Sequence, residues 1–144
     1  MGEAILNHKA KGQFTAYSAG SHPVGVVRDG ALKQLELAGI PTTGLRSKSW
    51  DEFGAPGAPV MNLVFTVCDN AAKEACPFWP GQPMTAHWGV ADPAEVEGMP
   101  DEVTRAYRDA FSTLDRRIGL FLSLPLSALE TMAIQKEIDR IGQQ

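Results

Sequence analysis

The stretch Val60–Ala94, VMNLVFTVCDNAAKEACPFWPGQPMTAHWGVADPA, holds both cysteines of the chain, Cys68 and Cys76. Within it, Leu63–Val67 is a short apolar run rich in β-branched residues, and it ends at Cys68. Such a run predicts a buried strand whose carboxyl end presents the thiol. Reacting groups in open α/β sheets gather beyond the carboxyl ends of the strands. Cys68 therefore stands where a reacting group would be useful.

Length and charge limit the class of protein. A chain of 144 residues with a formal net charge of −4 predicts a single domain, residues 1–144, and disfavours nucleic acid or anionic membrane as partners. No apolar run approaches the roughly 20 residues of a membrane span, and Met1–Asn7 lacks a signal-peptide pattern. These features predict a cytoplasmic protein. In that reducing compartment the two cysteines are expected to be free, catalytic or redox-active rather than a structural staple.

Hydrophobic periodicity predicts alternating helices and strands along the chain. Helices are expected at Gly2–His8, Val26–Ala38, Ser49–Phe53, Asp101–Leu124 and Leu126–Ile141, and strands at Phe14–Ser18, Leu63–Val67 and Thr85–Trp88. The first of these helices has no capping residue and no strand before it, which is typical of the rear half of a longer helix. The alternation predicts an α/β fold whose parallel sheet is covered on both faces. Three strands make a small sheet, which is consistent with a missing fourth.

Several runs together resemble one known family. They are YSAGSHPVG (Tyr17–Gly25), GLRSKSWDEF (Gly44–Phe53), VFTVCDNAAKEACPFWPGQPMTAHWG (Val64–Gly89), ADPA (Ala91–Ala94) and RRIGLFLSLP (Arg116–Pro125). Through these runs nearly the whole chain resembles the arsenate reductases built on the low-molecular-weight tyrosine phosphatase fold. The resemblance implies a flavodoxin-like, three-layer α/β fold with a parallel sheet. It also implies reduction of arsenate to arsenite, an arsenic-detoxification reaction, by cysteines that act in sequence.

One element of the family pattern is absent from this sequence. In the family, the first strand ends in a Cys-x5-Arg loop that holds the oxyanion and supplies the nucleophile. Neither Cys68 nor Cys76 has an arginine at that distance. The chain is therefore expected to lack the first strand and the nucleophile loop, either because the true start lies upstream or because it is a degenerate copy. As it stands, it is expected to be inactive, marginally stable and prone to self-association through exposed sheet edges.

The resemblance assigns a role to each of three residues. Asp92, in an Asp-Pro pair, matches the general acid that protonates the departing oxygen, a task for which partial burial would have to raise its pKa. Cys68 matches the second thiol, which attacks the cysteine–arsenic adduct. Cys76 matches the third thiol, which takes over the disulfide by exchange. Thioredoxin or a glutaredoxin/glutathione system would then reduce the pair, and neither a cofactor nor a metal is expected.

Simpler interpretations stay open for the same residues. Cys68 can be a small buried hydrophobe at a strand end, and Asp92 can be a turn former. A zinc site of Cys68, Cys76 and His87 is disfavoured because the cysteine spacing exceeds that of common zinc motifs. For the chain as a whole, the alternatives are a non-catalytic remnant of the fold and a dithiol redox partner that acts through its two cysteines.

Four polar residues are expected to play ordinary roles. By resemblance, Glu3 and Ser18 match positions that support the oxyanion loop. With that loop absent, Glu3 is expected to be solvated and Ser18 to bond to a turn. Arg46 and Lys48 form a small basic spot, which is expected to be a solvated surface rather than an anion site.

Overall fold

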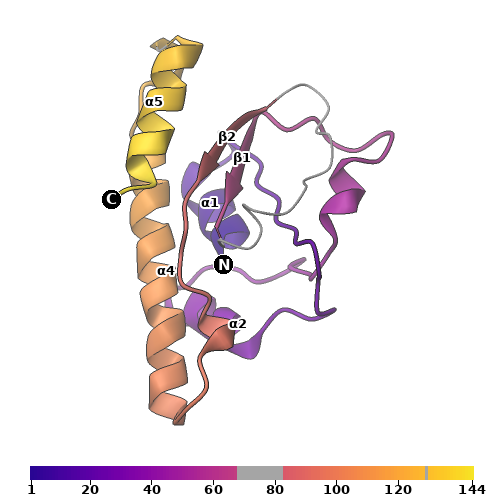
Figure 1. The fold of residues 1–144 in the computed structure, drawn as a ribbon, viewed down its shortest axis with the longest axis vertical. Coiled ribbons are helices and arrows are strands. Elements are labelled where there is room, and N and C mark those ends of the chain that lie inside the picture. Colours follow the sequence, from indigo (N-terminus) through magenta and orange to yellow (C-terminus); the bar gives the residue numbers. More distant parts are fainter. Residues whose placement is uncertain (68–82, 129) are drawn as a thin grey trace.

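The computed structural model describes residues 1–67, 83–128 and 130–144 (Figure 1). Its longer helices are α1 (Gly2–Ala10), α2 (Asp29–Leu37), α4 (Pro100–Leu122) and α5 (Thr131–Ile141); its short 3-10 helices are η1 (Trp50–Phe53), η2 (Pro93–Glu95) and η3 (Leu126–Ala128). The strands are β1 (Leu63–Thr66) and β2 (Met84–His87). They pair in parallel, with Leu63 opposite Met84 and Thr66 opposite His87. The predicted α/β fold with parallel strands is confirmed.

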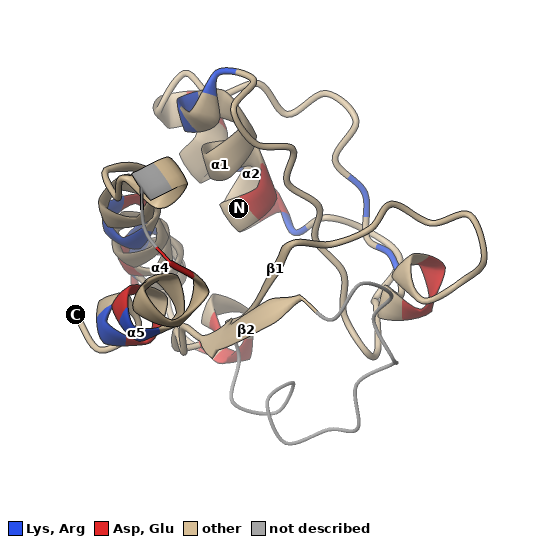
Figure 2. Ribbon diagram, turned by 90° about the horizontal axis from the view of Figure 1, so that it is seen from above, with Lys and Arg blue, Asp and Glu red and all other residues tan. Residues whose placement is uncertain are grey.

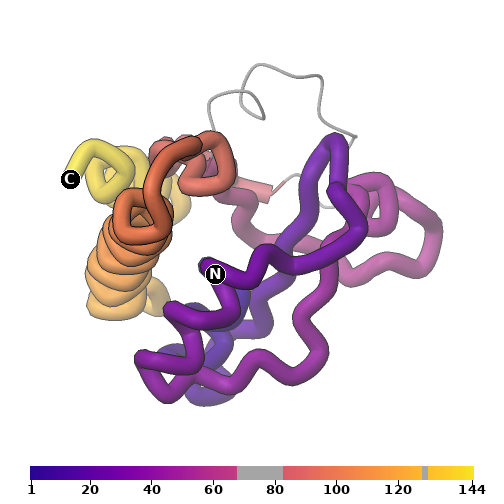
Figure 3. The backbone as a smooth tube through the Cα atoms, turned by 90° about the horizontal axis from the view of Figure 1, so that it is seen from below, coloured from indigo at the N-terminus to yellow at the C-terminus, as the bar shows by residue number. Residues whose placement is uncertain are grey.

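The strands and α4 meet in an aromatic core. Phe65 of β1 lies against Trp88, with ring centroids 4.1 Å apart, and forms a T-shaped pair with Phe121 of α4 at 5.6 Å. Phe14 packs on Phe121 from the N-terminal part of the chain at 5.2 Å. Figures 1 and 3 show α4 and α5 along one side of the molecule and the N-terminal half of the chain on the other. Phe121 is therefore one of the residues through which the two halves pack together.

Helix α4 follows its predicted pattern. Of the apolar stripe that the sequence predicts for it, Val103, Phe111 and Leu122 are partly buried and five residues are buried: Tyr107, Ala110, Leu114, Ile118 and Phe121. Pro100 occupies the first turn, where its missing N–H costs nothing. The helix ends at Leu122, close to the predicted stop, and Ser123 Oγ donates a hydrogen bond to the Leu120 carbonyl at 2.7 Å.

The sequence predicts that Gly39 ends the second helix and that Ser47 or Ser49 caps the third, and the structure confirms Gly39 and Ser49 in these roles. Gly39 adopts a φ of 72°, the left-handed conformation that ends a helix at low cost, and Ile40 N–H returns to the Leu35 carbonyl at 2.9 Å. Ser49 caps η1, since its Oγ accepts a hydrogen bond from Asp51 N–H at 3.2 Å. Local capping chemistry therefore places both helix boundaries.

The predicted strand at Phe14–Ser18 is wrong, because no strand is found there. A strand needs a neighbouring main chain, and in the described part of the chain this segment pairs instead with a side chain. Asn7 Nδ2 on α1 donates to the Ala16 carbonyl at 3.1 Å, and Ala16 N–H donates to Asn7 Oδ1 at 2.8 Å. The amide of Asn7 thus satisfies both main-chain groups of Ala16. An isolated parallel bridge between Gly20 and Ser49 follows.

The charged side chains of α4 and α5 are of both signs (Figure 2). One of them, Asp115 on α4, pairs with Lys9 on α1 at 2.7 Å and links the first helix to the longest one. Among the described helices, none has the length and apolar character needed to cross a membrane.

Candidate functional site

The cysteines of the sequence-predicted site, Cys68 and Cys76, lie outside the described residues. The chain that leads to Cys68 is described as far as Val67. The Val67 carbonyl accepts a hydrogen bond from Val90 N–H at 2.7 Å. Strand β1 ends at Thr66, two residues before Cys68 in the sequence.

The ladder between the two strands continues beyond their ends. Trp88 N–H donates to the Thr66 carbonyl at 2.7 Å, and the Thr66 hydroxyl lies 2.7 Å from His87 Nδ1. Because the strands are parallel, both carboxyl ends leave the sheet at the same edge. The chain that enters Cys68 and the chain that leads to Asp92 therefore start side by side. His87, the third member of the zinc alternative, is a partner of Thr66 here, and the described residues contain no group of three metal-binding side chains.

Asp92 is the one predicted catalytic residue in the described part of the chain. Its side chain caps η2, because Oδ1 accepts a hydrogen bond from Ala94 N–H at 2.9 Å and Pro93 fills the first helical position. Asp92 is exposed in the described structure, whereas a general acid was expected to be partly buried.

A buried arginine holds the segment between β2 and Asp92. Arg117 on α4 is 7% exposed, and its Nη1 donates to the carbonyls of Trp88 at 2.9 Å and Gly89 at 3.0 Å. Burial, and to a lesser degree the neighbouring Arg116, lowers the pKa of Arg117 from its usual value. Sequence reasoning missed this residue, although a signal existed: Arg117 stands directly beside Ile118 on the apolar stripe.

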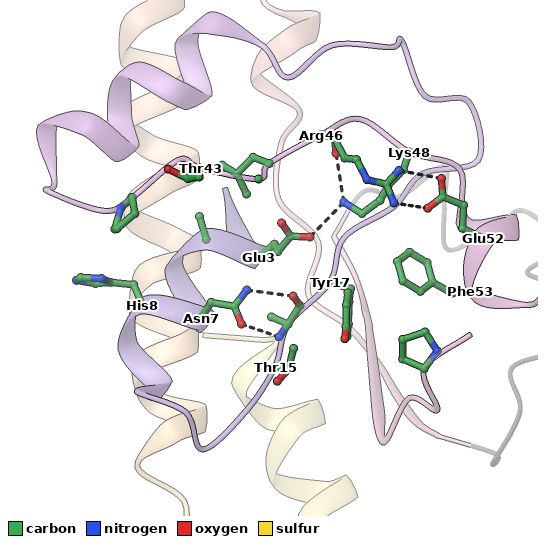
Figure 4. Close-up of a pocket in the computed structure, with 16 residues that line it drawn as sticks. Glu3, Asn7, His8, Thr15, Tyr17, Thr43, Arg46, Lys48, Glu52 and Phe53 are labelled. Carbon is green, nitrogen blue, oxygen red and sulfur yellow. Dashed lines mark hydrogen bonds and ion pairs between the residues drawn. The ribbon is translucent and has the colours of Figure 1, made fainter. Parts of the chain in front are cut away.

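The expectations for Glu3, Ser18 and Lys48 are wrong, because the three residues form one hydrogen-bonded cluster in which the side chains of Glu3 and Lys48 are largely buried. Figure 4 shows the Glu3–Lys48 pair. Glu3 Oε1 accepts hydrogen bonds from Ser18 N–H at 2.8 Å and Ser18 Oγ at 3.2 Å. Lys48 Nζ lies 3.2 Å from the same oxygen and also donates to the Arg46 carbonyl at 3.2 Å. A carboxylate at this depth needs a counter-charge, so Glu3 is paired rather than solvated and Ser18 bonds to Glu3 rather than to a turn.

Glu3 and Lys48 form part of the wall of a cavity of about 840 Å3 between α1, the Thr15–Tyr17 segment and residues 41–53. Arg46 lies in the same wall and makes a two-bond fork with Glu52, at 2.8 and 2.7 Å. That fork raises the pKa of Arg46 and lowers the pKa of Glu52. A smaller cavity of about 190 Å3 shares Arg46 and Lys48. Both cations therefore already have carboxylate partners, which argues against a strong anion site here.

Comparison with known proteins identifies relatives over most of the chain. Residues 1–137 match the family model described as "Low molecular weight phosphotyrosine protein phosphatase". The arsenate reductase of Halalkalibacterium halodurans is 32% identical over 109 residues, which cover 76% of this chain and 75% of that protein. The arsenate reductase of Shouchella clausii is 28% identical over 121 residues, 84% of each chain. The arsenate reductase of Bacillus subtilis is 32% identical over 112 residues, 76% of this chain and 75% of that protein. The resemblance drawn from the sequence motifs is confirmed.

Proposed function

Because the chain belongs to the low molecular weight phosphotyrosine protein phosphatase family, we propose that it takes part in reducing arsenate to arsenite, with Cys68, Cys76 and Asp92 as its reacting groups. The similarity to proteins named arsenate reductases supports the substrate. The observation that carries the site is the ladder from Thr66 and Val67 to Trp88 and Val90. Because of this ladder, the residues that lead to Cys68 and those that lead to Asp92 leave the sheet at the same edge.

The proposed reaction begins with a thiolate that attacks arsenic and forms a sulfur–arsenic bond. Asp92 donates a proton to the departing oxygen, which leaves as water. The Cys68 thiolate then attacks the first sulfur, and the sulfur–arsenic bond breaks with its electron pair on arsenic. Arsenic is thereby reduced from the +5 to the +3 state, while the two sulfurs are oxidised to a disulfide.

Cys76 completes the relay by exchange. Its thiolate attacks Cys68, releases the first thiolate and leaves a Cys68–Cys76 disulfide. A dithiol reductant of the thioredoxin type, or a glutaredoxin/glutathione system, then donates two electrons and two protons and restores both thiols. This chemistry needs a reducing compartment, so we place the protein in the cytoplasm.

The first thiolate of the scheme comes from a Cys-x5-Arg element, which the 144 residues do not contain. Backbone N–H groups and the arginine of such a loop hold a tetrahedral oxyanion while the thiolate attacks. The proposal therefore divides the reaction: the oxyanion site and the first sulfur belong to that element, and the disulfide relay belongs to Cys68 and Cys76.

A graft tests this division. The strand and Cys-x5-Arg loop of a related arsenate reductase are joined ahead of Met1, and arsenite formation is measured with thioredoxin, its reductase and NADPH. We expect arsenite from the grafted protein, none above background from the 144-residue chain, and loss of turnover in Cys68→Ser and Cys76→Ser versions of the graft. A folded graft that forms no arsenite would overturn the proposal.

A dithiol redox partner is the second candidate, favoured by the presence of two cysteines without the Cys-x5-Arg run. Mild oxidation of the 144-residue chain followed by intact-mass and peptide analysis should show a Cys68–Cys76 bond that thioredoxin reduces. If that bond forms and cycles while the graft makes no arsenite, the redox-partner function is favoured. If no internal bond forms, neither function holds and the non-catalytic remnant is left.

A further inference from the structure

We propose that Arg117 is a positioning residue that fixes the Trp88–Asp92 segment, and with it the carboxylate of Asp92, against the end of β1. The role of Asp92 as an acid rests on the proposed function. The placement of the segment by Arg117 rests on the contacts of the described residues alone.

The guanidinium group holds two successive carbonyl groups at the point where the chain leaves β2. Arg117 Nη1 donates to Trp88 at 2.9 Å and to Gly89 at 3.0 Å, and Nη2 lies 3.4 Å from the Gln144 main-chain oxygen. Consecutive carbonyls that converge on one donor group fix the course of the backbone between them. An arginine suits this task because its donors are rigidly arranged in a plane.

Trp88 is also held by its other polar groups. Its main-chain N–H donates to Thr66 at 2.7 Å, and its indole N–H donates to the Ile138 carbonyl of α5 at 2.9 Å. Trp88 is 3% exposed, and a Cβ at Gly142 would come within 2.8 Å of its ring. Trp88 is thus fixed by β1, α4 and α5 together, and it cannot shift unless one of these contacts breaks.

The residues that follow Gly89, as far as Asp92, are also fixed by contacts. Val90, directly after Gly89, donates its N–H to Val67, the residue before Cys68, at 2.7 Å. Asp92 then caps η2, which packs against α4, the helix that carries Arg117. The segment from Trp88 to Asp92 is therefore fixed at both ends by α4 and in the middle by Val67.

Burying the guanidinium group of Arg117 costs free energy, which argues that its contacts with the two carbonyl groups have a specific role. Arg117 Nε is buried and has no hydrogen-bond partner among the described residues. Burial lowers the pKa of the guanidinium group, because the loss of hydration disfavours its charged form. An apolar residue would fill this position of α4 more cheaply, but it would leave the carbonyls of Trp88 and Gly89 without these donors.

Amide hydrogen exchange of the 144-residue chain tests the proposal without arsenate. The variants are Arg117→Gln and Arg117→Lys, with Arg116→Gln as the matched control because Arg116 is an exposed neighbour of the same charge. The reporters are the N–H group of Val90, which bonds to the Val67 carbonyl, and the N–H group of Ala94, which bonds to Asp92 Oδ1. The reference is the N–H of Ile40, bonded to Leu35 far from this segment along the chain.

We expect Arg117→Gln to speed exchange at Val90 and Ala94 about tenfold relative to Ile40, because the loop opens locally once its donors are lost. Arg117→Lys should fall between wild type and Arg117→Gln, since an ammonium group cannot reproduce the planar fork. Arg116→Gln should leave the ratio unchanged. A purely structural role would instead speed exchange at all three amides equally, and that result, or no change at all, would overturn the proposal.

The test separates this inference from the proposed function. If exchange behaves as expected but the grafted protein makes no arsenite, the proposed function fails and Arg117 still positions the loop. If the graft is active and its Arg117→Gln version keeps the wild-type kcat and pH profile despite a loosened loop, the positioning of Asp92 has no part in the reaction and the catalytic half of the inference is overturned.

Discussion

Lys48 and Glu3 form an ion pair of 3.2 Å in which the side chains are only 5% and 12% exposed. The pair joins helix α1 to the segment that precedes η1, and Ser18 bonds to the same carboxylate oxygen. Nothing in the sequence near either residue indicates the other. The pair is therefore a long-range contact that holds the N-terminal helix in place.

Replacing Lys48 by Met should strongly destabilise the fold. Removing one member of a buried ion pair leaves the other charge uncompensated, which costs about 3 kcal/mol or more. The free energy of unfolding, measured by urea denaturation, reports the loss. The double variant Lys48→Met with Glu3→Gln should recover part of it, because the uncompensated carboxylate is then gone. A loss below about 1 kcal/mol for Lys48→Met would show that the pair behaves as a surface pair.

Gly30 on α2 should not tolerate a side chain. A Cβ at this position would lie 2.5 Å from the ring of Tyr107, which is buried on α4. Gly30→Ala should therefore cost about 1–3 kcal/mol in the free energy of unfolding, as overpacking does. Gly119→Ala is the matched control, because the nearest atom there is Lys9 Nζ at 3.9 Å. That control should be neutral or stabilising by about 0.5–1 kcal/mol, since it lies inside a helix.

Asn7 should protect the main chain of the Phe14–Ser18 segment. Asn7→Ala removes both hydrogen bonds to Ala16, and we expect a loss of about 1 kcal/mol. The exposed N–H and C=O groups then become available to another chain, so sedimentation velocity should show more association than for wild type at equal concentration. Unchanged sedimentation together with unchanged stability would mean that water replaces the amide of Asn7 at no cost.

The Arg46–Glu52 fork predicts a dependence of stability on pH. The guanidinium group lowers the pKa of Glu52 below its usual value of 4.5. A carboxyl with a lowered folded-state pKa stabilises the fold above its unfolded pKa, and the contribution disappears as the pH falls through the folded value. Urea midpoints of wild type and Glu52→Gln should therefore differ at pH 7 and converge well below pH 4.5. The effect is small because both side chains are exposed, and a gap that widens in acid would contradict it.

Local features of the fold could be predicted from the sequence. The apolar stripe of α4, the β1 run before Cys68, the Gly39 stop and the Ser49 cap each depend on neighbouring residues and on a known period or capping bond. The structure has these features near their predicted places. The parallel pairing followed from the alternation of strands and helices.

Contacts between distant residues could not be predicted in this way. Lys48 and Glu3 looked like solvated surface residues, because their depth depends on how α1 packs and not on local pattern. The Phe14–Ser18 segment alternates like a strand, yet the side chain of Asn7 takes the place of a neighbouring strand at Ala16. The partners of Arg117 could not be predicted either, because they are main-chain carbonyl groups, which every residue has.

The acceptors of Arg117 are uncharged, which distinguishes this contact from the Glu3–Lys48 ion pair. Amide oxygens of Trp88 and Gly89 take up no proton in mild acid, and dissolved ions have no full negative charge to screen there. Concentrated salt or mild acid should therefore leave the hydrogen bonds of Arg117 in place, because neither removes their acceptors.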